Sequence, residues 1–147
     1  FLTRRRHKPP HYPVIAGDRE RMGDDASMPE RHDDAVRRFA DACQLGDIAT
    51  LRASLDADAV AVCDGGGVVP APGPVRGAED VARLAAALLC GQPDTELTIE
   101  SVNGRAGLAL RRAGQAVAVV AVKEIDARVA LLWIVLNPAK LRGWHRR

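Results

Sequence analysis

VNGRAGLALRRAGQAVAVVAVKEIDARVALLWIVLNPAKL, residues 102–141, is the stretch that decides the fold. It contains three apolar runs of strand length, at residues 108–112, 116–123 and 129–136. Small and β-branched residues, with few polar ones in the second and third runs, are typical of strands buried on both faces. Gly114 and Asp126 lie between the runs, where hairpin turns need permissive residues. The stretch predicts an antiparallel meander, which Asn137-Pro138 ends because proline has no N–H for a strand ladder.

Helices are expected before this meander. Apolar residues recur at three- and four-residue steps from about Pro29 or Arg31 to Leu45, which predicts a helix with one buried stripe. Similar reasoning predicts helices at 48–55, capped by Asp47, and 78–89, strands at 59–63 and 95–102, and an irregular return strand at 68–71. Helices followed by an antiparallel sheet predict an α+β domain with the helices on one face. A curved sheet of this kind leaves a hollow that can hold a small ligand or a partner's segment.

Composition limits the classes of function. The 147 residues allow one domain, and a net charge of +2 is too small to favour nucleic-acid binding by the domain itself. The three cysteines, Cys43, Cys63 and Cys90, lack metal-ligand spacing, so we expect free thiols in a reducing cytoplasm and no metal site. The sequence has no run of 18 apolar residues, so neither a membrane span nor a membrane partner is expected.

The first residues differ from the rest. Residues 1–31 are rich in proline, glycine and charges of both signs, and apolar residues are sparse. Such a composition buries too little surface to offset the loss of chain entropy. We therefore predict a flexible linker at 1–31 and a folded domain at 32–147.

Four segments carry a family resemblance: AVAVCDGGG (59–67), PVRGAEDVARLAAALL (74–89), SVNGRAGLALRRAGQAVAVVAV (101–122) and LWIVLNPAKLRGW (132–144). In this order they resemble the C-terminal SnoaL-like domain of extracytoplasmic-function RNA polymerase sigma factors. The resemblance implies the SnoaL-like cone, also called cystatin-like or nuclear-transport-factor-2-like, with three N-terminal helices packed on a curved antiparallel sheet. In that family a lysine usually follows the glycine turn and the last motif usually reads NPDKL. Here Val68 and Ala139 take those two places.

The resemblance also implies a function. In the family this domain follows the sigma region that reads promoter −35 elements. It supports and restrains sigma activity through contacts near two motifs, which here are the glycine turn DGGG (64–67) and NPAKL (137–141). The basic start at residues 3–7 resembles the tail of that preceding region. The implied partners are the sigma helical regions and the RNA polymerase core, with promoter DNA reached only through sigma regions outside this chain. The implied partner-contact residues are Asp64, Gly65, Gly66, Gly67, Asn137, Pro138, Lys140, Leu141 and Trp144.

Other interpretations of the same residues stay open. The glycine segment can be a plain hairpin turn, and residues 137–141 a strand terminator. Trp144 lies among charged residues, so we expect it to be exposed. We expect Trp133, Glu100 and Val119 to line the hollow, where a small apolar ligand could bind. Trp133 lies in the most apolar run, which favours a place in the core over one lining the hollow.

The main alternative function is a free-standing SnoaL-like binding protein or a cyclase/isomerase-type enzyme. Related cones use carboxylates, histidine or tyrosine in the hollow for proton transfer. The predicted domain has His32 at the start of a helix, no tyrosine and no acid–base pair at a telling spacing. We therefore expect no catalytic residues, no cofactor and no enzymatic activity. A monomer and a homodimer through the open sheet face both remain possible.

Overall fold

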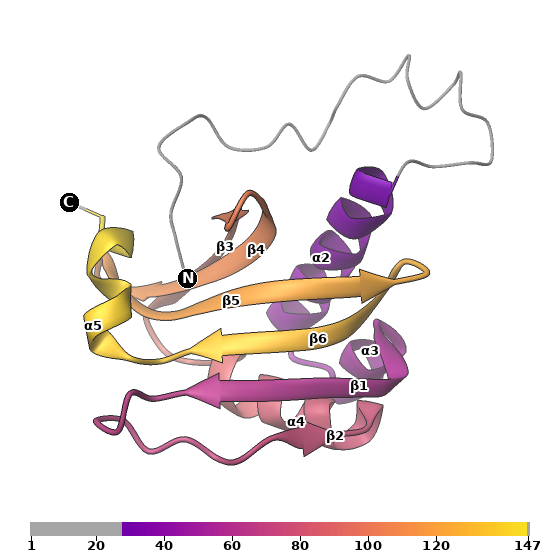
Figure 1. Cartoon of the computed structure of the whole chain (residues 1–147), viewed down its shortest axis with the longest axis horizontal. Coiled ribbons are helices and arrows are strands. Elements are labelled where there is room, and N and C mark those ends of the chain that lie inside the picture. The colour runs from indigo at the N-terminus through magenta and orange to yellow at the C-terminus, as the bar shows by residue number, and fades with distance from the viewer. Residues whose placement is uncertain (1–27, 147) are drawn as a thin grey trace.

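The computed structural model of the chain describes residues 28–146 (Figure 1). Two helices, α2 (Met28–Leu45) and α3 (Ile48–Ala53), come first, followed by β1 (Leu55–Asp64), β2 (Val75–Arg76) and α4 (Ala78–Leu89). The second half contains β3 (Thr95–Val102), β4 (Arg105–Arg112), β5 (Gln115–Ile125), β6 (Arg128–Val135), α5 (Pro138–Leu141) and the 3-10 turn η1 (Arg142–Trp144). Helix α2 begins within the range expected to be linker, and the rest of the expected linker lies outside the described residues.

The predicted meander is confirmed. Strands β3 to β6 pair antiparallel with their chain neighbours through three two-residue turns. Both residues of each turn have positive φ: Asn103 and Gly104, Ala113 and Gly114, Asp126 and Ala127. This is the type I′ geometry, whose twist matches that of the flanking strands. Tight turns of this kind set the register of the strand pairs next to them, and bulges shift it further along β4–β5 and β5–β6.

The first long strand returns to pair with the last. The strand order is β2-β1-β6-β5-β4-β3, and β1 runs parallel to β6 with Asp64 opposite Val135. The short edge strand β2 pairs with the middle of β1, where Val60 lies opposite Arg76. The strand expected at 68–71 is wrong, because these residues form a turn and loop. Pro70 and Pro72 cannot donate to a ladder, and the pairing begins only at Val75.

Each face of the sheet carries a hydrophobic core, a main one under the helices and a smaller one on the opposite face. Helices α2, α3 and α4 lie on one face (Figure 1), and their buried side chains share the main core with Leu108, Ala118 and Val120. We call this the helix face. On the opposite face, which we call the outer face, Leu141 of α5 and Trp144 of η1 pack against the strand residues Val119 and Val135. Bulges in β4–β5 and β5–β6 bend the strands, which makes the sheet curved. The central strands are thus buried on both faces, as predicted.

Candidate functional site

The glycine turn and the Asn-Pro motif meet at one end of the sheet, where β1 and β6 both finish. Strands β1 and β6 are parallel neighbours, so both end on the same side. The backbone N–H of Leu136 donates to the carbonyl oxygen of Asp64 at 2.7 Å. The glycine turn after β1 therefore lies directly against the Asn-Pro turn after β6, although the sequence separates them by about seventy residues.

One carboxylate connects the two segments. Asp64 Oδ1 accepts a hydrogen bond from the Gly66 N–H at 2.9 Å, and Oδ2 accepts one from Lys140 Nζ at 2.7 Å. The hydrogen bond from Lys140 holds the pKa of Asp64 below its usual range. The Lys140 side chain remains 39% exposed, so its ammonium group can also be reached from solvent.

Asn137 and Gly66 form a second contact between the segments. Asn137 Oδ1 caps α5 by accepting from the Ala139 N–H at 3.1 Å, with Pro138 in the first helical turn. The Asn137 amide lies so close to Gly66 that a Cβ there would be 2.3 Å from its Cγ. Gly66 also has a φ of +65°, which favours glycine. We call Asp64, Gly66, Asn137 and Lys140 the junction.

The other glycines of the turn differ from one another. A Cβ on Gly65 would lie 2.0 Å from the Val69 carbonyl oxygen, whereas Gly67 has open space around it and needs only its positive φ. The Gly65 carbonyl accepts from the N–H groups of Val68 and Val69, which closes the turn. Val68 is 74% exposed. The position where the resembling family usually has lysine therefore points an apolar side chain into solvent.

A groove of about 380 Å³ lies beside the junction. Its lining is mainly apolar, with His145 at one side: Val69, Gln115, Ala116, Val117, Leu136, Pro138, Leu141 and His145. The His145 Nδ1 atom accepts a hydrogen bond from the Ala116 N–H at 2.9 Å, which fixes the ring against β5. Val69 and His145 belong to no sequence motif, and only the fold brings them together.

Trp144 was expected to be exposed, and this is wrong. Its side chain is 2% exposed and packs on the outer face of the sheet. The turn made by α5 and η1 brings the chain back across β5, where the Arg146 N–H donates to the Gly114 carbonyl oxygen. The Trp144 carbonyl also accepts from Arg111 Nε at 2.8 Å. Arg142, His145 and Arg146 are exposed, while the indole of Trp144 faces inward.

The three residues expected to line the hollow lie on the wrong side of the sheet for that role. Val119 is fully buried in the outer-face core, against which Trp133 packs. Glu100 also points to the outer face, since it pairs with Arg111 and Arg146 and its neighbour Ile99 packs into the helix-face core. Successive residues of a strand point to opposite faces of the sheet, and the sequence of the strand does not show which of the two faces the helices cover.

The Glu100–Arg111 pair is the most buried ion pair of the described residues. The Arg111 side chain is 2% exposed and that of Glu100 13%. Burial alone raises the pKa of Glu100, but hydrogen bonds from Arg111 and Thr98 outweigh it and hold the pKa below the usual range. The pair, with the bond from Arg111 to the Trp144 carbonyl, fastens the C-terminal turn to β3 and β4. It is a structural anchor that no sequence motif marks.

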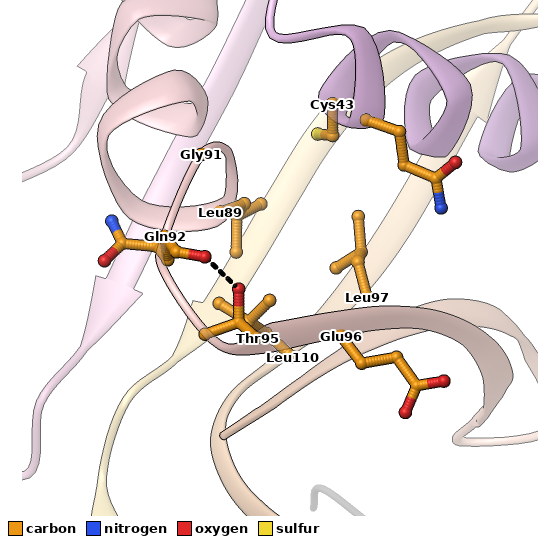
Figure 2. Close-up of a pocket in the computed structure, with 9 residues that line it drawn as sticks. Cys43, Leu89, Gly91, Gln92, Thr95, Glu96, Leu97 and Leu110 are labelled. Carbon is orange, nitrogen blue, oxygen red and sulfur yellow. Dashed lines mark hydrogen bonds between the residues drawn. The ribbon is translucent and has the colours of Figure 1, made fainter. Parts of the chain in front are cut away.

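A pocket on the helix side lies between the ends of α2 and α4 and strand β3 (Figure 2). It has a volume of about 380 Å³ and is lined by Cys43, Gln44, Leu89, Gly91, Gln92, Thr95, Glu96, Leu97 and Leu110. None of the three residues expected to line a cavity is among them. Its polar groups are two amides, a threonine hydroxyl that donates to the Gln92 carbonyl, and the exposed Glu96.

His32 is a buried polar group of the helix face. Its Nε2 donates to the Ala106 carbonyl oxygen at 2.8 Å, while Nδ1 has no hydrogen-bond partner. Burial lowers the pKa of His32, so the neutral ring is favoured. Among residues 28–146, no cluster of three or more potential metal ligands occurs, and no helix is long and apolar enough to cross a bilayer.

Solved structures resemble the described fold. The extracytoplasmic-function sigma factor SigJ of Mycobacterium tuberculosis superposes with a TM-score of 0.58 at 26% identity, over 77% of this chain and 44% of that one. An NTF2-like protein of unknown function from Mesorhizobium loti gives 0.56 at 24% identity, over 77% and 96% of the two chains. A SnoaL-like polyketide cyclase from Jannaschia gives 0.52 at 18%, over 76% and 90%.

The chain corresponds to less than half the length of the sigma factor. No protein-family model matches the sequence, and no curated protein matches it. The neighbours include a sigma factor, a cyclase and a protein of unknown function, so what they share is the architecture. The expected fold class is confirmed: the chain has the α+β, NTF2-like or SnoaL-like fold, with helices packed on a curved sheet.

Proposed function

We propose that this domain regulates an extracytoplasmic-function sigma factor through intramolecular contacts made at the junction. The observation that carries the proposal is the meeting of the two motifs, which the parallel β1–β6 pair brings together in one exposed surface. The similarity to the sigma factor SigJ at 26% identity supports it. On this proposal the domain acts by contact and not by catalysis.

The junction and the groove suit a partner segment with both apolar and acidic groups. Exposed Pro138 and half-buried Val69 and Leu136 offer apolar surface in the groove. Lys140, which precedes the lining residue Leu141 in the chain, places a positive charge at the junction. Apolar anchors surrounded by charge are the usual composition of a protein–protein contact. The proposed partners are the sigma helical regions and the RNA polymerase core, with promoter DNA contacted by those regions.

In vitro transcription with the proposed sigma factor, of which residues 32–147 are the regulatory domain, tests the proposal. The complete protein is compared with a version lacking residues 32–147, on one promoter and one core polymerase. Loss of the domain should change the transcript yield, and the sign tells whether the domain supports or restrains initiation. An unchanged yield contradicts the proposal.

A charge reversal tests the surface itself. Lys140→Glu reverses the positive charge at the junction, whereas Arg142→Glu makes the same reversal at an exposed residue two positions away. A lost charged contact of about 1 kcal/mol changes occupancy about fivefold. We expect Lys140→Glu to alter the yield by that factor and Arg142→Glu to leave it unchanged. Equal effects of both reversals would assign the result to net charge and not to the junction.

The pocket between α2, α4 and β3 supports a second candidate, a small-molecule-binding protein or a cyclase/isomerase-type enzyme. Its volume of about 380 Å³ lies within the range of small-molecule sites. A thermal-shift screen of small metabolites on the 147-residue chain tests this candidate. A hit that Leu97→Trp abolishes would favour it, because that substitution fills the pocket without touching the junction.

A further inference from the structure

The outer face of the sheet carries apolar side chains beyond its small core. Helix α5 and turn η1 pack on this face at the end where β6 finishes (Figure 1). Farther along, four half-buried apolar side chains lie side by side: Val60 and Val62 of β1, and Leu131 and Trp133 of β6. Val60 lies opposite Leu131 and Val62 opposite Trp133, so all four point to the face on which Trp133 packs, the outer one. We call these four residues the outer patch.

Two exposed cations flank the outer patch. Arg76 of β2 lies opposite Val60, and Lys123 of β5 lies opposite Leu131, so both side chains share the face of the patch. Within residues 28–146, neither cation has an ion pair or a side-chain hydrogen bond. Unpaired charges beside half-buried apolar side chains indicate a surface that an oppositely charged partner completes.

The spacing of these groups fits an α-helix. Arg76 and Lys123 belong to one row across β2, β1, β6 and β5, so three strand spacings, about 14 Å in all, separate their backbones. An α-helix with its side chains is about 10–12 Å wide. A helix that lies along β1 and β6 therefore rests its apolar stripe on the outer patch and presents the residues on either side of that stripe to one cation each.

We propose that the outer patch binds an amphipathic helix of a protein partner, whose apolar stripe is bordered by carboxylates on both sides. The stripe covers the four side chains of the patch, and the carboxylates pair with Arg76 and Lys123. This interaction surface is separate from the junction and does not depend on the regulatory function proposed above.

A second copy of this chain is a poorer partner for the outer patch. In a symmetric dimer the same patch faces itself, so Arg76 and Lys123 of one copy lie against the same cations of the other. Like charges that meet at an interface cost free energy. The next carboxylate along the outer face of β1, that of Asp64, is already bonded to Lys140. The charges therefore favour an acidic partner over a homodimer.

Binding of a synthetic helix to the 147-residue chain tests the proposal. The probe is a peptide of about 18 residues, long enough to form a helix, with leucines on one stripe and glutamates on both sides of it. Its matched control has lysine at every glutamate position. Fluorescence anisotropy of the labelled peptide gives the Kd, and the tryptophan emission of the chain reports the place of binding, because Trp133 lies in the patch and Trp144 is already buried. We expect the glutamate helix to bind about tenfold more tightly than the lysine helix and to shift the Trp133 emission to the blue.

Substitutions locate the binding surface. Arg76→Glu and Lys123→Glu should each weaken binding of the glutamate helix about fivefold, whereas Arg142→Glu, at an exposed cation outside the patch, should leave it unchanged. Leu131→Asp should weaken it about tenfold or more. If Leu131→Asp does not fold, the two charge reversals still decide, because both replace exposed side chains.

Four results would overturn the proposal. They are no binding of the glutamate helix, equal binding of the two helices, binding that neither reversal in the patch weakens, and a dimer in light scattering that either of these reversals alters. The last result would identify the outer patch as an interface between copies of this chain.

Discussion

Gly66→Ala should test the junction more directly than any other substitution, because it affects both the backbone and the side chain that Gly66 contacts. Gly66 has a φ of +65°, and an added Cβ would lie 2.3 Å from Asn137 Cγ and 2.5 Å from both of its terminal atoms. Gly67→Ala is the matched control. Its φ is +77°, but nothing lies within 4 Å of its Cβ position.

The expected cost of Gly66→Ala has two parts. A left-handed backbone costs an alanine about 1 kcal/mol. The methyl group must also displace the Asn137 side chain, which then no longer caps α5, for about 1 kcal/mol more. We therefore expect about 2 kcal/mol for Gly66→Ala and about 1 kcal/mol for Gly67→Ala.

Urea unfolding at 25 °C, followed by circular dichroism and by tryptophan fluorescence, measures these free energies. Asn137→Ala completes a double-mutant cycle with Gly66→Ala. Alone it should cost about 1 kcal/mol for the lost cap. Together the two should cost about 2 kcal/mol and not 3, because both substitutions remove the same Asn137 cap, which can be lost only once.

Two results would refute this reasoning. If Gly66→Ala costs no more than Gly67→Ala, the close approach of Asn137 does not constrain the turn. If the two substitutions of the cycle are additive, the side chain of Asn137 is not what the methyl group displaces.

Three further predictions concern the interior. Burial lowers the pKa of His32, so the unfolded chain binds more protons and stability should fall as the pH drops below about 6.5, by at most about 1.4 kcal/mol per pH unit. His32→Gln should flatten that part of a urea-midpoint profile between pH 7.5 and 5.5, and an unchanged profile would contradict the assignment. Glu100→Gln should cost about 3–5 kcal/mol in urea unfolding, because it leaves the Arg111 charge buried without its partner; a cost below 1 kcal/mol would mean that water solvates the pair. Gly107→Ala should lower the Tm far more than Gly143→Ala, because its Cβ would lie 2.4 Å from a backbone oxygen of the neighbouring strand, whereas the Cβ at 143 meets nothing within 4 Å. Equal thermal midpoints would show that β4 can shift away.

Most of the fold could be predicted because its signals are local. The helix at 78–89 and the strand at 95–102 agree with α4 and β3 residue for residue, since a cap, a period or a turn residue marks each end. The turns at Gly114 and Asp126 were also recognised, because two-residue hairpins need residues that tolerate positive φ. Ala113 and Ala127 also have positive φ, although alanine does not indicate a turn. The other residue of each turn, Gly114 or Asp126, gives the signal.

The arrangement of these elements was harder to predict. The pattern of β1 does not say that it runs parallel to β6, because a buried strand has the same alternation in either direction. The sequence therefore did not predict that the two motifs meet. The burial of Trp144 depends on a four-residue helix that turns the chain back over the sheet. Neighbouring charges in the sequence said nothing of that reversal.

The parallel pairing of β1 with β6 also has a consequence for the order of folding. Strands β3 to β6 are joined by two-residue turns, so their contacts close short loops. Pairing β1 with β6 closes a loop of about seventy residues, which costs more chain entropy before any contact forms. We expect Val120→Ala, in β5, to slow folding and Val62→Ala, in β1, mainly to speed unfolding in a φ-value measurement. The junction is then among the last features to form, so a partner that binds it binds only chains whose folding is complete.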